Sequence, residues 1–170
     1  MSSVSEVCAK IDGLLGTMAL STANGQAVSL WAQHCKDIMR LPGNRSLTTW
    51  KFQAISDIDE DGSTETGDAD LIAATKLYAL CVGCVDVTAE HRWVACYDAD
   101  SATFDGTAAL ANSVATVLLI QDAASAAAEE YYCASWQQGF TLGTGLTIAS
   151  DGVDGANTET SELRGWVLFI

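Results

Sequence analysis

A run near the middle of the chain, residues 77–87, most constrains how this sequence can fold. Its side chains are apolar at both odd and even positions, whereas a strand with one solvated face alternates apolar and polar residues. We therefore expect a strand that is covered on both faces. One side is assigned Leu77, Ala79, Cys81, Val85 and Val87, and the other Tyr78, Leu80, Val82 and Cys84.

A second strand-like run, 91–98, follows the turn-like residues 88–90. Trp93, Ala95 and Tyr97 share one of its faces, so the two runs predict an antiparallel hairpin at the centre of the domain. Further strands are expected from residue 46 and at 114–121, 131–136, 145–149 and 163–170, the last too apolar to lie outside a sheet or a subunit interface. About seven such strands predict a mainly β fold, an antiparallel β-sandwich of jelly-roll or Greek-key type.

The start of the chain has the period of helices. Residues 4–19 place apolar side chains three and four positions apart, which makes one stripe of an amphipathic helix. A second amphipathic helix is expected over 26–40. We therefore divide the chain into a short helical N-terminal arm, 1–45, and a β-sandwich domain, 46–170. Two such helices cannot form a core alone, so we expect their stripes to pack on the sandwich or on other copies of the arm.

The charge is divided unevenly between the two parts. Residues 1–51 hold five basic and three acidic side chains, whereas residues 52–170 hold three basic and nineteen acidic ones. Such an acidic surface repels phosphate backbones, which disfavours nucleic-acid binding, and it keeps a protein soluble at high concentration. The chain shows neither a secretory signal pattern nor a run of ~18 apolar residues, so no membrane partner is expected.

An acidic stretch, 57–68, has the spacing of an EF-hand-type calcium loop. Carboxylates stand at its first, third and fifth positions and a glycine at the sixth, and calcium requires several converging oxygens. The twelfth position holds an aspartate, which is shorter than the glutamate that usually binds there. We expect a solvated acidic loop, with calcium as the alternative and the sole candidate cofactor. The candidate ligands are Asp57, Asp59, Asp61, Glu65 and Asp68.

The six cysteines lie in apolar periodic runs, which favours reduced thiols that pack in the core. Cys81 and Cys84 have CxxC spacing, but residues three apart in a strand point to opposite faces, and no second pair follows. A metal or redox site would need Cys96, Cys133 and His91 to converge on them.

The sequence does not predict an enzyme. It contains no GxSxG elbow and no cysteine in an electropositive setting, and its two histidines, His34 and His91, fall in different regions. His34, at the edge of the second helical stripe, is expected to be a packing or surface residue.

Four stretches in the second half carry a family pattern: Leu77-Tyr78, 92–103 (RWVACYDADSAT), 117–120 (VLLI) and 140–149 (FTLGTGLTIA). Over residues 76–170 the chain resembles the small β-sandwich structural proteins of tailed-phage virions, which decorate heads or tails. In that family the YD-x-x-S-A stretch resembles a strand end that runs into a loop, and the GLTIA stretch a late strand after a glycine turn. The resemblance implies a virion role and supplies no catalytic residue.

The sequence therefore predicts a capsid decoration or cement protein that binds and stabilises the particle surface, and not an enzyme. Its expected partners are the major capsid protein or other virion proteins, and its expected oligomer is a homotrimer. The expected location is the virion, which assembles in the host cytoplasm. The arm is expected to meet the shell or neighbouring subunits through Leu14, Leu15, Met18 and Trp31. The alternatives are a tail or neck component, or a module that binds a glycan or receptor, with calcium at the acidic loop.

Overall fold

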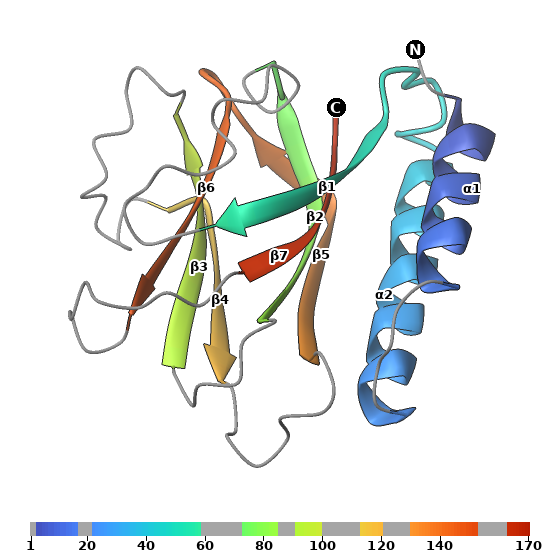
Figure 1. Cartoon of the computed structure of the whole chain (residues 1–170). Helices are drawn as coiled ribbons and strands as arrows, with labels where there is room; N and C mark the ends of the chain where they lie inside the picture. Colours follow the sequence, from blue (N-terminus) through green and yellow to red (C-terminus); the bar gives the residue numbers. More distant parts are fainter. Residues whose placement is uncertain are drawn as a thin grey trace.

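The computed structural model describes residues 3–16, 22–58, 73–84, 91–99, 113–120, 130–152 and 163–170. In this part of the chain two helices precede seven strands (Figure 1). The elements are α1 (Val4–Leu15), α2 (Thr22–Arg40), β1 (Lys51–Ile58), β2 (Lys76–Cys84), β3 (His91–Asp98), β4 (Ala115–Ile120), β5 (Glu130–Thr141), β6 (Leu146–Gly152) and β7 (Leu163–Phe169). None of the described helices is long and apolar enough to cross a membrane.

The strands form two antiparallel sheets, so the prediction of a mainly β fold is confirmed. One sheet has the strand order β1-β7-β2-β5 and the other the order β4-β3-β6. Figure 1 shows the four-stranded sheet between the three-stranded sheet and the two helices. This middle sheet is therefore covered on both faces.

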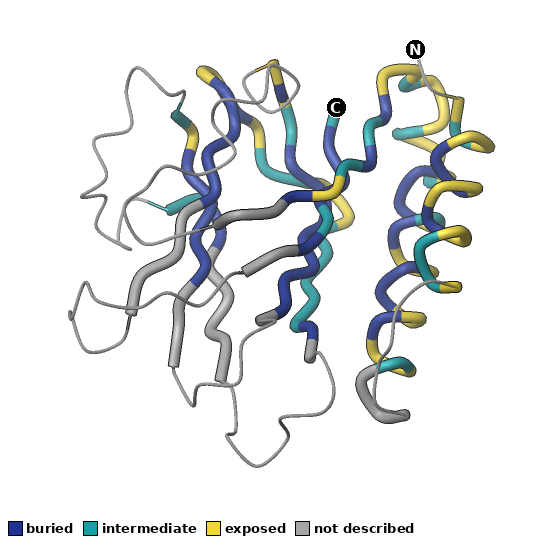
Figure 2. Tube along the Cα trace, in the orientation of Figure 1, coloured by how far each residue is buried: buried dark blue, intermediate teal, exposed yellow. Residues whose placement is uncertain are grey.

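Two apolar cores lie on the two faces of the middle sheet. The inter-sheet core contains Ile55, Ala74, Leu77, Leu80, Val82, Val94, Cys96, Ala115, Leu142, Leu146, Ile148, Val167 and Phe169. The helix–sheet core contains Val7, Cys8, Ile11, Val28, Trp31, Ala32, Cys35, Ile38, Met39, Trp50, Phe52, Tyr78, Ala79, Cys81, Tyr131 and Leu168. In Figure 2 the buried positions of both helices face this sheet, and the exposed positions face away from it.

Strand β2 confirms the prediction of a strand that is buried on both faces. Residues 77–83 are all buried, with Leu80 in the inter-sheet core and Cys81 in the helix–sheet core. A β-bulge breaks the alternation between Leu77 and Ala79. Leu77 therefore shares a core with Leu80, and not with Ala79 as strict alternation predicts.

The prediction that β2 and β3 form a hairpin is wrong. β2 pairs with β5 along one edge and with β7 along the other, while β3 pairs with β4 and β6 in the other sheet. Alternation of side chains indicates which faces of a strand are buried, but the edges present backbone groups that are the same in every strand. The local pattern therefore did not determine the neighbours of β2.

Strand β7 lies inside the middle sheet, which is one of the two places, a sheet or a subunit interface, that the sequence predicted for this apolar segment. It lies between β1 and β2, and the carbonyl of Ile170 accepts a hydrogen bond from the N–H of Thr75 at 2.6 Å. A Cβ at Gly165 would lie 1.9 Å from the carbonyl oxygen of Cys81. Only glycine allows β7 and β2 to approach this closely at that point.

Strand β5 contains a wide bulge on the edge of the middle sheet. Its pairing with β2 passes from Phe140 to Ser135 while β2 advances by two residues, so 136–139 lie opposite Tyr78 alone. Gly139 turns the chain here with φ at 65°, and a Cβ on it would lie 2.7 Å from a carbonyl oxygen of β2. The bulge places the rings of Trp136 and Phe140 edge to face, with centroids 5.0 Å apart.

The helices belong to the same packed unit as the sheets. α1 begins with a capping box, in which Ser3 accepts a hydrogen bond from the N–H of Glu6 and the Glu6 carboxylate accepts one from the N–H of Ser3. An ion pair between Asp12 and Lys36 joins α1 to α2. The helical segment predicted as an arm, 1–45, therefore forms one layer of the structure over its described residues.

Trp31 joins this layer to the sheet. Its side chain is 3% exposed, its ring lies 6.0 Å from that of Phe52, and its Nε1 donates a hydrogen bond to the carbonyl of Ala134 in β5 at 2.9 Å. The side chain predicted to contact a partner thus packs inside the chain.

We expect Trp31→Ala to lower the free energy of unfolding by about 3–5 kcal/mol, because it empties a large buried site and removes the partner of a carbonyl. The neighbouring Leu30, which is 59% exposed, provides the control, and Leu30→Ala should change stability by less than about 0.5 kcal/mol. Urea unfolding monitored by circular dichroism measures both. Equal effects of the two substitutions would contradict the placement of α2 on the sheet.

Candidate functional site

The predicted calcium ligands fall mostly outside the described residues. Asp57 lies near the end of β1, where its backbone alone is described, and the other four candidates, Asp59, Asp61, Glu65 and Asp68, lie in 59–72. Among the described residues, no group of three or more His, Cys, Asp or Glu side chains could hold a metal ion. The calcium hypothesis stays a prediction.

The predicted interface residues divide into three kinds. Trp31 is buried in the helix–sheet core, and Leu14 and Leu15 are half-buried against the same core. Met18 lies outside the described residues. The described part of the stripe is thus directed toward the chain's own sheet, which was one of the two expected destinations, and its Leu14 and Leu15 keep some exposed surface.

A pocket of about 320 Å³ lies at the seam between α2 and β5. It is lined by His34, Asp37, Ile38 and Leu41 on the helix side and by Ser135 and Gln137 on the strand side. Ile38 is buried, whereas His34, Asp37 and Gln137 are exposed, so polar groups surround a partly apolar floor. Gln137 belongs to the wide bulge, which therefore shapes one wall of the pocket.

The pocket brings together a serine, a histidine and an aspartate, but not in the geometry of a catalytic triad. A triad requires hydrogen bonds from nucleophile to base and from base to orienting carboxylate. None of the hydrogen bonds of the described residues joins Ser135, His34 and Asp37. The Asp37 carboxylate instead accepts a hydrogen bond from Nε2 of Gln33 at 2.8 Å. The arrangement can bind a small polar molecule through these donors and acceptors.

The Asp98 carboxylate forms the most concentrated set of polar contacts between β3 and the turn before β6. It accepts hydrogen bonds from the N–H of Gly143 at 2.8 and 2.9 Å, of Thr144 at 2.7 Å and of Gly145 at 3.4 Å. Burial alone would raise the pKa of Asp98, but these three donors outweigh it and hold the pKa below its usual value. Asp98 thus fixes the turn that opens β6.

Sequence reasoning noted both halves of this contact without joining them. YD lies in the 92–103 stretch and GTG in the 140–149 stretch of the family pattern. The structure brings these two stretches together, with Asp98 and Leu146 as cross-strand partners. An aspartate at a strand end and a glycine-rich turn are each common signals. Nothing in the sequence pairs two positions that lie this far apart, and the same holds for the two walls of the pocket.

Five cysteines with described side chains are free thiols, and all of them but the half-buried Cys133 are buried: Cys8, Cys35, Cys81, Cys96 and Cys133. Cys96 lies in the inter-sheet core, where burial raises its pKa to about 12. Cys35 and Cys81 lie on the opposite face of the middle sheet, in the helix–sheet core, and Cys133 packs against that core. The sheet therefore separates Cys96 from Cys81 and Cys133, with which it would have to converge in a metal site.

Comparison of the chain with known proteins finds no matching family model and no matching curated protein. The fold and the side chains described above are therefore the basis for any functional proposal.

We expect Asp98→Asn to destabilise the protein at pH 7 by about 1 kcal/mol, since this exposed carboxylate loses charge-assisted hydrogen bonds that water partly replaces. The pKa of Asp98 is lower in the folded state than the unfolded value of about 3.9. Its contribution is therefore complete above that value and is lost as pH falls through the folded-state pKa. The stability difference between the wild type and Asp98→Asn should accordingly be constant from pH 7 to about pH 4 and shrink between about pH 4 and about pH 2.

Urea unfolding across this pH range measures the difference directly. Thr144→Ala is the matched control, because it keeps the backbone N–H that Asp98 accepts from and should leave the pH dependence unchanged. A difference between wild type and Asp98→Asn that is constant with pH would show that the ionised carboxylate does not hold the turn.

Proposed function

We propose that this chain is a structural protein of a phage virion, a capsid decoration or cement protein that binds the particle surface and stabilises it. The observation that carries the proposal is the order in which the strands pair. β1 pairs with β7, β2 with β5 and β3 with β4, so early strands pair with late ones in nested order. Such nesting over two facing sheets is typical of jelly rolls, an architecture that recurs in viral capsid domains.

The distribution of charge supports the same role and suggests which side meets the particle. Residues 1–51, which include both helices, carry a net charge of +2, and residues 52–170 carry −16. The outer face of the helix layer is exposed (Figure 2) and includes Lys10. The two helices hold three basic and three acidic side chains, so this outer face is close to neutral. Because Trp31 packs inward, we assign the contact with the particle to this near-neutral outer face and leave the acidic sandwich in solvent.

Co-sedimentation of the full chain with particles that lack it tests the proposal. Binding should be observed, and Lys10→Glu should weaken it severalfold, because it replaces a positive charge by a negative one within the proposed contact. The double variant Gln138→Glu, Thr141→Glu adds the same negative charge at exposed positions of β5 and serves as the control. A chain that never sediments with particles would exclude the decoration role, and equal weakening by both variants would exclude the helix layer as the contact.

The pocket between α2 and β5 favours a second function, a module that binds a small polar ligand such as a sugar. Its volume of about 320 Å³ lies at the lower end of the range of ligand pockets. Asp37, Ser135 and Gln137 present acceptors and donors at its rim. A glycan array should then give signals that Gln137→Ala removes, and an array without signals would leave the structural role alone.

A further inference from the structure

Three thiols gather on the helix-facing side of the middle sheet. Cys35 of α2 and Cys81 of β2 are both fully buried, and Cys133 of β5 is half-buried at their side. They are close enough to affect one another: burial and the neighbouring Cys133 raise the pKa of Cys35. The positions of these thiols come from the packing of α2 on the sheet.

The strand register distinguishes one pair among the three. Cys81 and Cys133 are direct partners across the antiparallel ladder of β2 and β5. Directly opposed residues have Cα atoms about 4.5–5.5 Å apart, which lies within the roughly 4.4–6.8 Å that a disulfide spans. Both side chains lie on the same face of the sheet, because Cys81 belongs to the helix–sheet core and Cys133 packs against it. The two sulfurs can therefore bond without a change in strand pairing.

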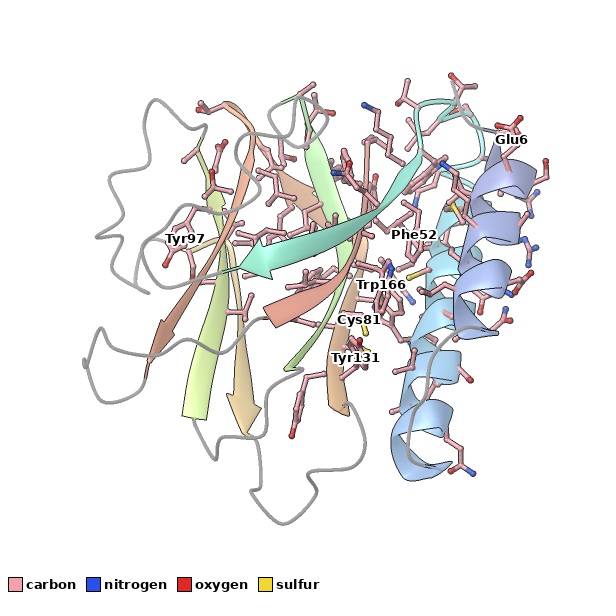
Figure 3. All side chains as sticks on the ribbon, viewed as in Figure 1. Glu6, Phe52, Cys81, Tyr97, Tyr131 and Trp166 are labelled. Carbon is pink, nitrogen blue, oxygen red and sulfur yellow. The ribbon has the colours of Figure 1, made fainter. Side chains whose placement is uncertain are left out.

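The burial of the two thiols makes Cys133 the one that an oxidant meets first. On its other side Cys81 is paired across the sheet with Trp166 of β7, whose ring lies 5.1 Å from that of Tyr131. Figure 3 shows Cys81, Trp166 and Tyr131 between the sheet and α2. Cys81 has no exposed surface, so a reagent from solvent meets Cys133 first.

We propose that Cys81 and Cys133 are an oxidation site, which hydrogen peroxide converts into a cross-strand disulfide within the folded chain. The Cys133 sulfur, as thiolate, attacks one peroxide oxygen, the O–O bond breaks, and a sulfenic acid and hydroxide form; the hydroxide takes up the proton that Cys133 released. The Cys81 sulfur then attacks the sulfenic sulfur, the S–S bond forms, and the departing hydroxide leaves as water with the Cys81 proton. Two thiols lose two electrons in total, and one peroxide becomes two waters.

The reaction is slow in the folded protein, because the attacking sulfur of the second step is rarely a thiolate. Burial, hydrogen bonding with Cys133 and the charges of Cys133 and Cys35 raise the pKa of Cys81 well above its usual value.

The disulfide bond joins the edge strand β5 to β2, which lies inside the sheet, and closes a loop of about fifty residues in the unfolded chain. The chain is thus a substrate for gradual oxidative cross-linking and not a fast redox sensor. This inference depends on strand register and holds whether or not the chain decorates a particle.

Peptide mapping after oxidation tests the pair. Trypsin leaves residues 77–92 in one peptide that contains both Cys81 and Cys84, so the mapping uses the full-length Cys84→Ser protein. The protein is treated with hydrogen peroxide without denaturant. Its remaining free thiols are then blocked, and it is digested with trypsin and chymotrypsin. We expect a linked peptide pair containing Cys81 and Cys133, a loss of two titratable thiols per chain, and a Tm that rises by about 5–10 °C.

Two further variants in the same Cys84→Ser background serve as matched controls. Adding Cys133→Ser should abolish the linkage and the rise in Tm, whereas adding Cys35→Ser should retain both. A link from Cys133 to Cys35, a full count of free thiols after oxidation, or a linked form whose Tm is unchanged or lower would each overturn the proposal.

Discussion

The middle sheet must be covered on both faces, and the other layers of this protein depend on that requirement. Its strands send apolar side chains to both sides, including Leu80 and Val82 toward the three-stranded sheet and Tyr78 and Leu168 toward the helices. Each large side chain of this kind contributes about 1.5–3 kcal/mol when it leaves water. A sandwich of two sheets alone would leave one face of the middle sheet in water. The helices are therefore part of the fold and supply its third layer.

Burial was predictable from the sequence, whereas the pairing of elements was not. The two apolar parities of β2, the helical stripes and the apolar C-terminal strand each indicate local structure. Within the described residues each is found where the pattern placed it, except that the bulge moves Leu77 to the other face of β2. The prediction of a hairpin between β2 and β3 was wrong. That two strands follow each other in the sequence is weak evidence that they pair, because β5 and β7 are equally suited to the two edges of β2. The bulge at Tyr78 was not predicted for a related reason, since it arises from the fit between β2, β5 and β7. Trp31 was predicted to be covered by the shell or a neighbouring subunit, whereas the chain's own sheet covers it, because a helical stripe does not determine which surface packs on it.

The candidate sites differ in the same way. The acidic loop could be noticed from sequence because its carboxylates are close along the chain, and most of it lies outside the described residues. The pocket joins α2 to β5, and the Asp98 contacts join β3 to the turn before β6, so both depend on residues that the fold alone brings together. Cys81 and Cys133 are the clearest example, since their relation is a register between two strands. A pattern along one segment cannot encode such a register.

The wide bulge of β5 has a consequence for how copies of the protein meet. Among the described residues β5 pairs with β2 alone, so it is an edge of the middle sheet. An intact edge strand offers a regular row of N–H and C=O groups onto which another chain can add a strand. Residues 136–139 interrupt that row, and the left-handed turn at Gly139 redirects the backbone groups on either side. The bulge therefore works against the addition of a strand from another copy along β5, which is one of the edges of the two described sheets.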